Sequence, residues 1–120
     1  MISAILYLPM WYMSCKFGRR ERPLQTVLFL TDYCNLSCRH CTTSGHACHV
    51  MKPLKQIREE LMYAYERGAR FLDLEGGEPT LWREGNGDIN TVIRLAKEIG
   101  FYTVTVTTNA QCPFNGLEAD

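Results

Sequence analysis

The fold of this chain is decided by Thr26-Val-Leu-Phe-Leu-Thr-Asp-Tyr-Cys-Asn-Leu-Ser-Cys-Arg-His-Cys41, because this stretch joins a strand directly to a loop of three cysteines. Its first six residues form a continuous apolar, β-rich run, which is typical of a strand buried on both faces. A loop follows from Asp32 to about Lys52. Loops of this length inside a compact domain are usually functional or disordered. We therefore predict a buried strand that ends in a functional loop.

Downstream of this loop, predicted helices and strands alternate along the chain. Apolar residues recur at helical spacing over residues 53–68 and again over 88–100, and each stretch ends at a glycine. The runs Phe71-Leu-Asp-Leu-Glu75 and Tyr102-Thr-Val-Thr-Val-Thr-Thr108 predict two further strands. The apolar residues of the two helical patterns are Leu54, Ile57, Leu61, Ala64 and Tyr65, and then Ile89, Val92, Ile93, Ala96 and Ile99.

The order strand, helix, strand, helix, strand implies a parallel sheet with right-handed crossovers. A doubly wound sheet and a (β/α) barrel both fit this order, and in both the chemistry collects at the C-terminal ends of the strands. Three polar motifs obey that rule: Cys34–Cys41 follows the first strand, Gly76-Gly-Glu-Pro79 the second and Thr108-Asn109 the third. We therefore predict an α/β fold in which the three motifs lie together at the C-terminal ends of the strands.

Composition limits the classes of function. The 46% hydrophobic content of the 120 residues is ample for the packed core of one domain, or of part of one. Thirteen basic residues balance thirteen acidic ones, so charge offers no case for a nucleic-acid partner. The six cysteines come without a convincing secretion signal, so we expect a cytoplasmic protein whose clustered cysteines bind metal rather than form disulfides.

Residues 1–23 are predicted to be an apolar and basic N-terminal extension, ahead of a core domain at residues 24–120. The apolar stretch Met1–Met13 contains Pro9 and is shorter than the about 20 residues that cross a bilayer as a helix. Contact with a membrane surface is one interpretation, because basic residues follow the stretch. We favour instead a helix or extended arm that covers part of the core. The basic residues are Lys16, Arg19, Arg20 and Arg22.

The cysteine loop and the glycine motif together resemble the radical S-adenosylmethionine (radical SAM) superfamily. Its hallmark is a CxxxCxφC loop after the first strand, where φ is usually an aromatic residue. Cys34, Cys38 and Cys41 match the three cysteines, and His40 occupies the φ position. The string at residues 31–41 looks most like the branch of molybdenum-cofactor and peptide-modifying enzymes. The resemblance implies the first three βα units of a partial (β/α)6 TIM-like barrel, so that residues 24–120 would form an incomplete core domain.

The resemblance also implies cofactors and partners. Family members hold a [4Fe–4S] cluster through three cysteines, here Cys34, Cys38 and Cys41, and bind SAM at the fourth iron. Reductive cleavage of SAM gives methionine and a 5′-deoxyadenosyl radical, which abstracts hydrogen from a substrate. The implied partners are an electron donor of the flavodoxin or ferredoxin type and an unknown small-molecule or peptide substrate. An incomplete barrel is expected to bind the cluster without completing turnover.

The residues that the resemblance places near SAM end the second and third strands. Gly76 and Gly77 lack a β-carbon, so the backbone there can closely approach a ligand. Glu78 is expected to contact the methionyl ammonium of SAM, with Pro79 biasing its backbone toward an extended conformation. On the third strand, the polar groups of Thr108 and Asn109 match the family loosely, and Asn109 equally fits the start of a turn.

A zinc-binding or thiol-redox module is the alternative interpretation of the cysteine loop. The three cysteines can complete a four-ligand zinc site with a residue that follows them, and Cys38-Arg-His-Cys41 also fits a dithiol pair. Neither alternative explains the glycine motif or the placement of motifs at successive strand ends. The candidate fourth ligands are His46, Cys48 and His49; Cys15 and Cys112 are expected to be small hydrophobes, and Asp73 and Glu75 are candidates for the interior of a barrel.

Overall fold

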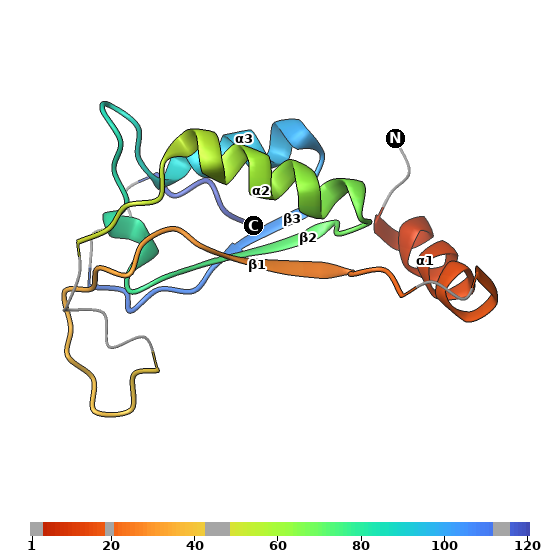
Figure 1. Ribbon diagram of the computed structural model, residues 1–120, viewed down its shortest axis with the longest axis horizontal. Coiled ribbons are helices and arrows are strands. Elements are labelled where there is room, and N and C mark those ends of the chain that lie inside the picture. The colour runs from red at the N-terminus through yellow and green to blue at the C-terminus, as the bar shows by residue number, and fades with distance from the viewer. Residues whose placement is uncertain (1–3, 19–20, 43–48, 112–115) are drawn as a thin grey trace.

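Three parallel strands form the centre of the molecule, in the order β1-β2-β3. The computed structural model describes residues 4–18, 21–42, 49–111 and 116–120, and Figure 1 shows the arrangement of its elements. The parallel α/β sheet predicted from the sequence is confirmed. The elements are α1 (Ala4–Gly18), β1 (Gln25–Phe29), α2 (Leu54–Glu66), β2 (Phe71–Glu75), the 3-10 helix η1 (Pro79–Leu81), α3 (Ile89–Ile99) and β3 (Thr103–Val106).

Helices α2 and α3 cover one face of the sheet and enclose the hydrophobic core (Figure 1). Alternate residues of each strand point toward these helices, as the pleat of a strand requires. Trp82, which follows η1, is fully buried in the core, and its indole N–H donates to the Lys52 carbonyl at 2.8 Å. The core residues on the strands are Leu28, Leu72, Leu74 and Val104, and those on the helices include Ile57, Leu61, Val92, Ile93 and Ala96.

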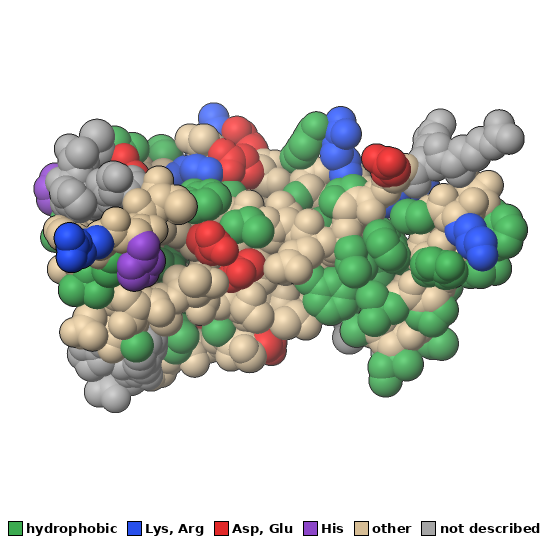
Figure 2. All heavy atoms as spheres, turned by 90° about the horizontal axis from the view of Figure 1, so that it is seen from below, with side chains coloured by type: hydrophobic (Ala, Val, Ile, Leu, Met, Phe, Trp, Pro, Cys, Tyr) green, Lys and Arg blue, Asp and Glu red, His purple; other side chains and the backbone are tan. Residues whose placement is uncertain are grey.

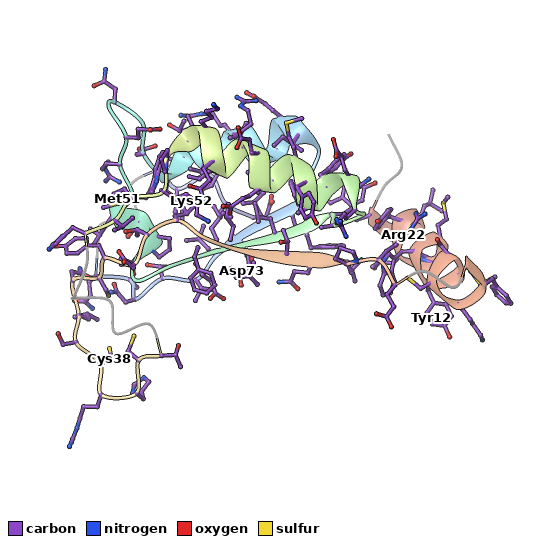
Figure 3. The ribbon with its side chains drawn as sticks, viewed as in Figure 1. Tyr12, Arg22, Cys38, Met51, Lys52 and Asp73 are labelled. Atoms are coloured by element: carbon purple, nitrogen blue, oxygen red, sulfur yellow. The ribbon has the colours of Figure 1, made fainter. Side chains whose placement is uncertain are left out.

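The opposite face of the sheet carries no helix among the described elements. Val27 on β1 lies in register with Asp73 on β2 and, through it, with Thr105 on β3. Figure 3 shows Asp73 on the side away from α2 and α3, and Figure 2 shows acidic side chains in the middle of this face. Because side chains alternate along a strand, Glu75 shares the face with Asp73. In a closed barrel this face would be the interior.

Helix α3 begins and ends at the signals that the sequence contains. Asp88 caps its first turn by accepting from the Asn90 N–H, and Thr91 completes a capping box. Gly100 ends the helix in the left-handed region, with a φ of 117°. These signals determine where α3 begins and ends, and therefore where the chain turns into β3.

Helix α1 lies at the N-terminal end of the sheet, opposite the cysteine loop (Figure 1). The predicted helix is present, but it does not contribute to the core, since none of its side chains is fully buried. Its links to the domain include the Tyr7 hydroxyl donating to the Gly68 carbonyl and the Trp11 indole donating to the Arg22 carbonyl. Its exposed apolar side chains gather at one end of the molecule in Figure 2. Among the described residues, no helix is long and apolar enough to cross a membrane.

Deleting residues 1–18 should lower the free energy of unfolding by about 2 kcal/mol, because it removes two hydrogen bonds and the contacts of the Tyr7 ring with Tyr102 and Arg70. Urea denaturation followed by circular dichroism measures this change. Leu74→Ala is the comparison, because Leu74 is fully buried and its truncation should lower the free energy of unfolding by about 3–5 kcal/mol. A deletion as costly as Leu74→Ala would show that α1 belongs to the core.

Candidate functional site

The glycine motif after β2 is hydrogen-bonded to the first residues of the cysteine loop. The Leu30 N–H donates to the Glu75 carbonyl at 2.9 Å, which continues the pairing of β1 with β2. Beyond the strands, the Gly77 N–H donates to Thr31 and the Glu78 N–H donates to Tyr33, both at 2.8 Å. The two loops therefore leave the sheet side by side, and the position of one determines the position of the other.

This close approach explains why residues 76 and 77 are glycines. A β-carbon on Gly76 would lie 2.5 Å from the Thr31 carbonyl oxygen. A β-carbon on Gly77 would clash with the backbone of Asp32 and Tyr33. The structure shows that the two glycines admit the backbone of the cysteine loop. Their approach to a ligand, which the sequence predicted, stays a prediction. Nothing in the sequence alone showed that the two loops touch.

The side chain of Glu78 is fully buried and joins the end of β2 to the end of β3. One carboxylate oxygen accepts from the Thr108 hydroxyl at 2.7 Å and from the hydroxyl and the N–H of Thr80. The other accepts from the Asn109 N–H at 2.8 Å. Since a carboxylate only accepts hydrogen bonds, these donors satisfy both of its oxygens inside the protein. Sequence analysis assigned Glu78 to a ligand and missed both this linking role and Thr80.

Asn109 extends the link from β3 to the cysteine loop. Its side-chain N–H₂ donates to the Asn35 side-chain oxygen at 2.8 Å and lies 3.7 Å from the sulfur of Cys34. Its side-chain oxygen accepts from the Gln111 N–H at 3.0 Å, so the turn predicted at this residue is also present. The structure thus brings together Cys34, Glu78 and Asn109, one from each predicted motif.

The three cysteines lie on a loop that projects beyond the sheet (Figure 3). Cys38 is exposed, while Cys34 and Cys41 are half-buried, and the Cys41 N–H donates to the Cys38 carbonyl at 3.1 Å. The Leu36 N–H also points at the sulfur of Cys34, at 3.4 Å. Among the described residues, no three His, Cys, Asp or Glu side chains are gathered as a ready metal site. The side chains of the loop suit an iron–sulfur cluster, because thiols are the usual ligands of such clusters and N–H groups lie beside the Cys34 sulfur.

The base of the cysteine loop is closed by contacts that sequence analysis missed. The Thr31 hydroxyl donates to the Val50 carbonyl at 2.8 Å, and the Val50 N–H donates to the Asp32 carboxylate at 3.1 Å. The rings of Tyr33 and His49 stack with centroids 4.4 Å apart. Because these contacts join the two ends of the loop, the cysteines are carried on a closed loop. Of the other proposed zinc ligands, His46 and Cys48 lie outside the described residues, as does Cys112.

Parallel strands that alternate with helices, with a cysteine loop after the first strand and a glycine loop after the second, place the chain in the class of (β/α) domains. The profile of the Radical SAM superfamily matches residues 28–118. The chain therefore belongs to the radical SAM superfamily, as the resemblance predicted.

Curated relatives of the chain carry the name GTP 3′,8-cyclase. The probable GTP 3′,8-cyclase of Sulfurisphaera tokodaii is 35% identical over 96 residues, which cover 78% of this chain and 28% of the relative. The GTP 3′,8-cyclase of Haemophilus influenzae is 34% identical over 86 residues, covering 68% of this chain and 25% of the relative. The chain thus spans about a quarter of the length of these relatives.

Solved structures of SuiB from Streptococcus suis share the fold. SuiB bound to its precursor peptide SuiA aligns with a TM-score of 0.66 and 27% identity, over 88% of this chain and 24% of SuiB. SuiB bound to S-adenosylmethionine aligns with a TM-score of 0.65 and 26% identity, over 93% of this chain and 27% of SuiB. The predicted fold class is confirmed: three parallel strands alternating with helices, matching part of a radical SAM partial barrel.

Gly77→Ala should lower the free energy of unfolding by at least about 2 kcal/mol, because its β-carbon separates the two loops and breaks two backbone hydrogen bonds. Chemical denaturation measures the loss. Gly18→Ala is the matched control, since a β-carbon there meets only the Ser14 hydroxyl at 3.9 Å. Equal stability of the two variants would contradict the close approach of the loops.

Glu78→Gln should lower the free energy of unfolding by about 3 kcal/mol. The new amide would place N–H groups against the donors that now surround the carboxylate. Glu75→Gln is the control, three residues away on the other face of the sheet, and should change stability by less than about 0.5 kcal/mol. Thermal unfolding of both variants compares the two positions. If Glu78→Gln is as stable as the control, Glu78 does not link the strand ends.

Proposed function

We propose that this chain is the cofactor-binding part of a radical SAM enzyme, in which Cys34, Cys38 and Cys41 hold a [4Fe–4S] cluster. The observation that carries the proposal is the link formed by Glu78 and Asn109, which unites the cysteine loop with the ends of β2 and β3. A structural zinc loop needs no such link to the neighbouring strands. An enzyme that must bind SAM beside its cluster does, because it must orient two cofactors together.

Gly76, Gly77, Glu78 and Pro79 form the SAM side of the proposed site. The buried Glu78 carboxylate fixes the loop, so the groups that the loop offers to the SAM ammonium are the main-chain carbonyls of Gly76 and Gly77. No donor among the described residues bonds these two carbonyl oxygens. Thr108 and Asn109 lie on the same side of the proposed site, and they hold the glycine loop in position through their hydrogen bonds to Glu78. A carbonyl suits an ammonium ligand because it only accepts hydrogen bonds.

When bound, the cluster and SAM supply the reductive cleavage that yields a 5′-deoxyadenosyl radical. The protein's own part is to hold the thiolates, orient SAM and keep water from the site. We propose an electron donor of the flavodoxin or ferredoxin type and a cytoplasmic location. The substrate is a small molecule or a peptide, since the relatives include GTP 3′,8-cyclases and a protein bound to its precursor peptide. Substrate choice and turnover are proposed for a whole enzyme, of which this chain matches about a quarter.

Anaerobic reconstitution with iron and sulfide tests the proposal. The wild-type chain should take up iron and sulfide in equal amounts, and serine at Cys34, Cys38 or Cys41 should abolish that uptake because each thiolate is a ligand. Cys15→Ser is the matched control, since Cys15 lies on α1 and should not affect uptake. Metal and sulfide analysis with the absorption spectrum gives the readout. A colourless protein with stoichiometric zinc and no sulfide would replace this proposal with the zinc module.

A further inference from the structure

The side chain of Asn109, which follows β3, reaches the cysteine loop. Its N–H₂ group has two contacts there: the Asn35 side-chain oxygen at 2.8 Å and the Cys34 sulfur at 3.7 Å. The second distance is within the range of a long hydrogen bond to sulfur. Among the described residues, Cys34 therefore has two N–H donors beside it, one from the backbone of Leu36 within its own loop and one from Asn109 after β3.

The orientation of the Asn109 amide follows from its partners. Its oxygen accepts from the Gln111 N–H at 3.0 Å, so its nitrogen must face Asn35 and Cys34. The reverse orientation would direct the oxygen at the Asn35 oxygen and leave the Gln111 N–H facing another donor. The network thus directs the N–H₂ group of Asn109, and not its oxygen, at the Cys34 sulfur.

The side chain of Asn109 is separable from the link through Glu78. Glu78 is bonded by the backbone N–H of Asn109, together with Thr80 and the Thr108 hydroxyl. A substitution at Asn109 keeps that backbone contact and removes only the side-chain amide. The amide contact can therefore be tested without dismantling the junction of the strand ends.

We propose that Asn109 is a positioning residue for Cys34, which holds the cysteine loop against β3 and raises the reduction potential of the cluster. The inference rests on the proposed function, because the potential is that of the cluster on Cys34. An N–H donor near a ligand sulfur stabilises the extra electron of the reduced state, and hydrogen bonds to sulfur are among the factors that set iron–sulfur potentials. Leu36 supplies one such donor from within the loop; Asn109 supplies the one that depends on β3.

A redox titration of the reconstituted full chain, without SAM and followed by electron paramagnetic resonance, tests the electronic part. Dithionite supplies the one electron that the cluster takes up. The potential should fall in Asn109→Ala and fall further in Asn109→Asp, where a carboxylate replaces the donor. Asn90→Ala is the matched control: the Asn90 amide bonds the Gly116 carbonyl and accepts from Glu118, away from the loop, so its loss should leave the potential unchanged.

Asn35→Ala separates the amide donor from the packing of the loop. This variant removes the 2.8 Å partner of Asn109, whose oxygen also lies 4.0 Å from the Cys34 sulfur, but leaves the N–H group of Asn109 beside Cys34, so the potential should not fall. A fall equal to that of Asn109→Ala would show that loop packing sets the potential, and would overturn the inference. Equal potentials in wild type, Asn109→Ala and Asn109→Asp would overturn it too.

The cluster-free chain provides a second readout that does not depend on the proposed function. Iodoacetamide should alkylate Cys34 roughly threefold more slowly in Asn109→Ala than in wild type, because the thiolate is the species that reacts and the lost N–H donor no longer stabilises it. Cys38 is exposed in either case and should react at an unchanged rate. Peptide mapping by mass spectrometry gives both rates. Unchanged alkylation of Cys34 would overturn the contact itself, whereas failure of the wild-type chain to take up iron and sulfide would overturn the proposed function.

Discussion

The buried carboxylate of Glu78 is the interaction on which the candidate site depends. A fully buried charge is costly unless hydrogen bonds satisfy it, and here donors come from Thr80, Thr108 and Asn109. Those donors lie on both sides of the gap between β2 and β3, so satisfying the carboxylate requires the two strand ends to stay together. The Gly77 contact with Thr31 then extends the arrangement to the cysteine loop. One buried group therefore positions the ends of all three strands.

Much of this arrangement could be predicted from the sequence, because local signals determine it. The alternation of helices and strands and the glycines that end α2 and α3 are properties of neighbouring residues, as is the motif after each strand. The tasks of individual side chains were less accessible. Glu78 was expected to face a ligand, and only the folded chain brings Thr108 and Asn109 close enough to occupy its oxygens. The same holds for the Tyr33–His49 stack, which joins residues at opposite ends of a loop.

The two ends of the sheet differ in chemistry. At the carboxyl ends of the strands, polar side chains and main-chain groups surround the cysteine loop, as parallel sheets place their binding sites. At the opposite end, α1 exposes apolar side chains such as Ile5 and Phe17. The sequence predicted a helix or arm here but not its exposure, because an apolar pattern signals burial without naming the surface that provides it. The uncovered face, with Asp73 and Glu75, runs between these two ends.

In the function proposed for this chain, three cysteines hold a four-iron cluster while SAM binds at the remaining iron. Mössbauer spectroscopy of the chain reconstituted with ⁵⁷Fe, with and without SAM, tests it most directly, because the method reports on each iron separately. If SAM binds at one iron, adding SAM should change the signal of that iron and leave the others as they were. A spectrum that SAM does not alter, or one in which every iron changes alike, would contradict it.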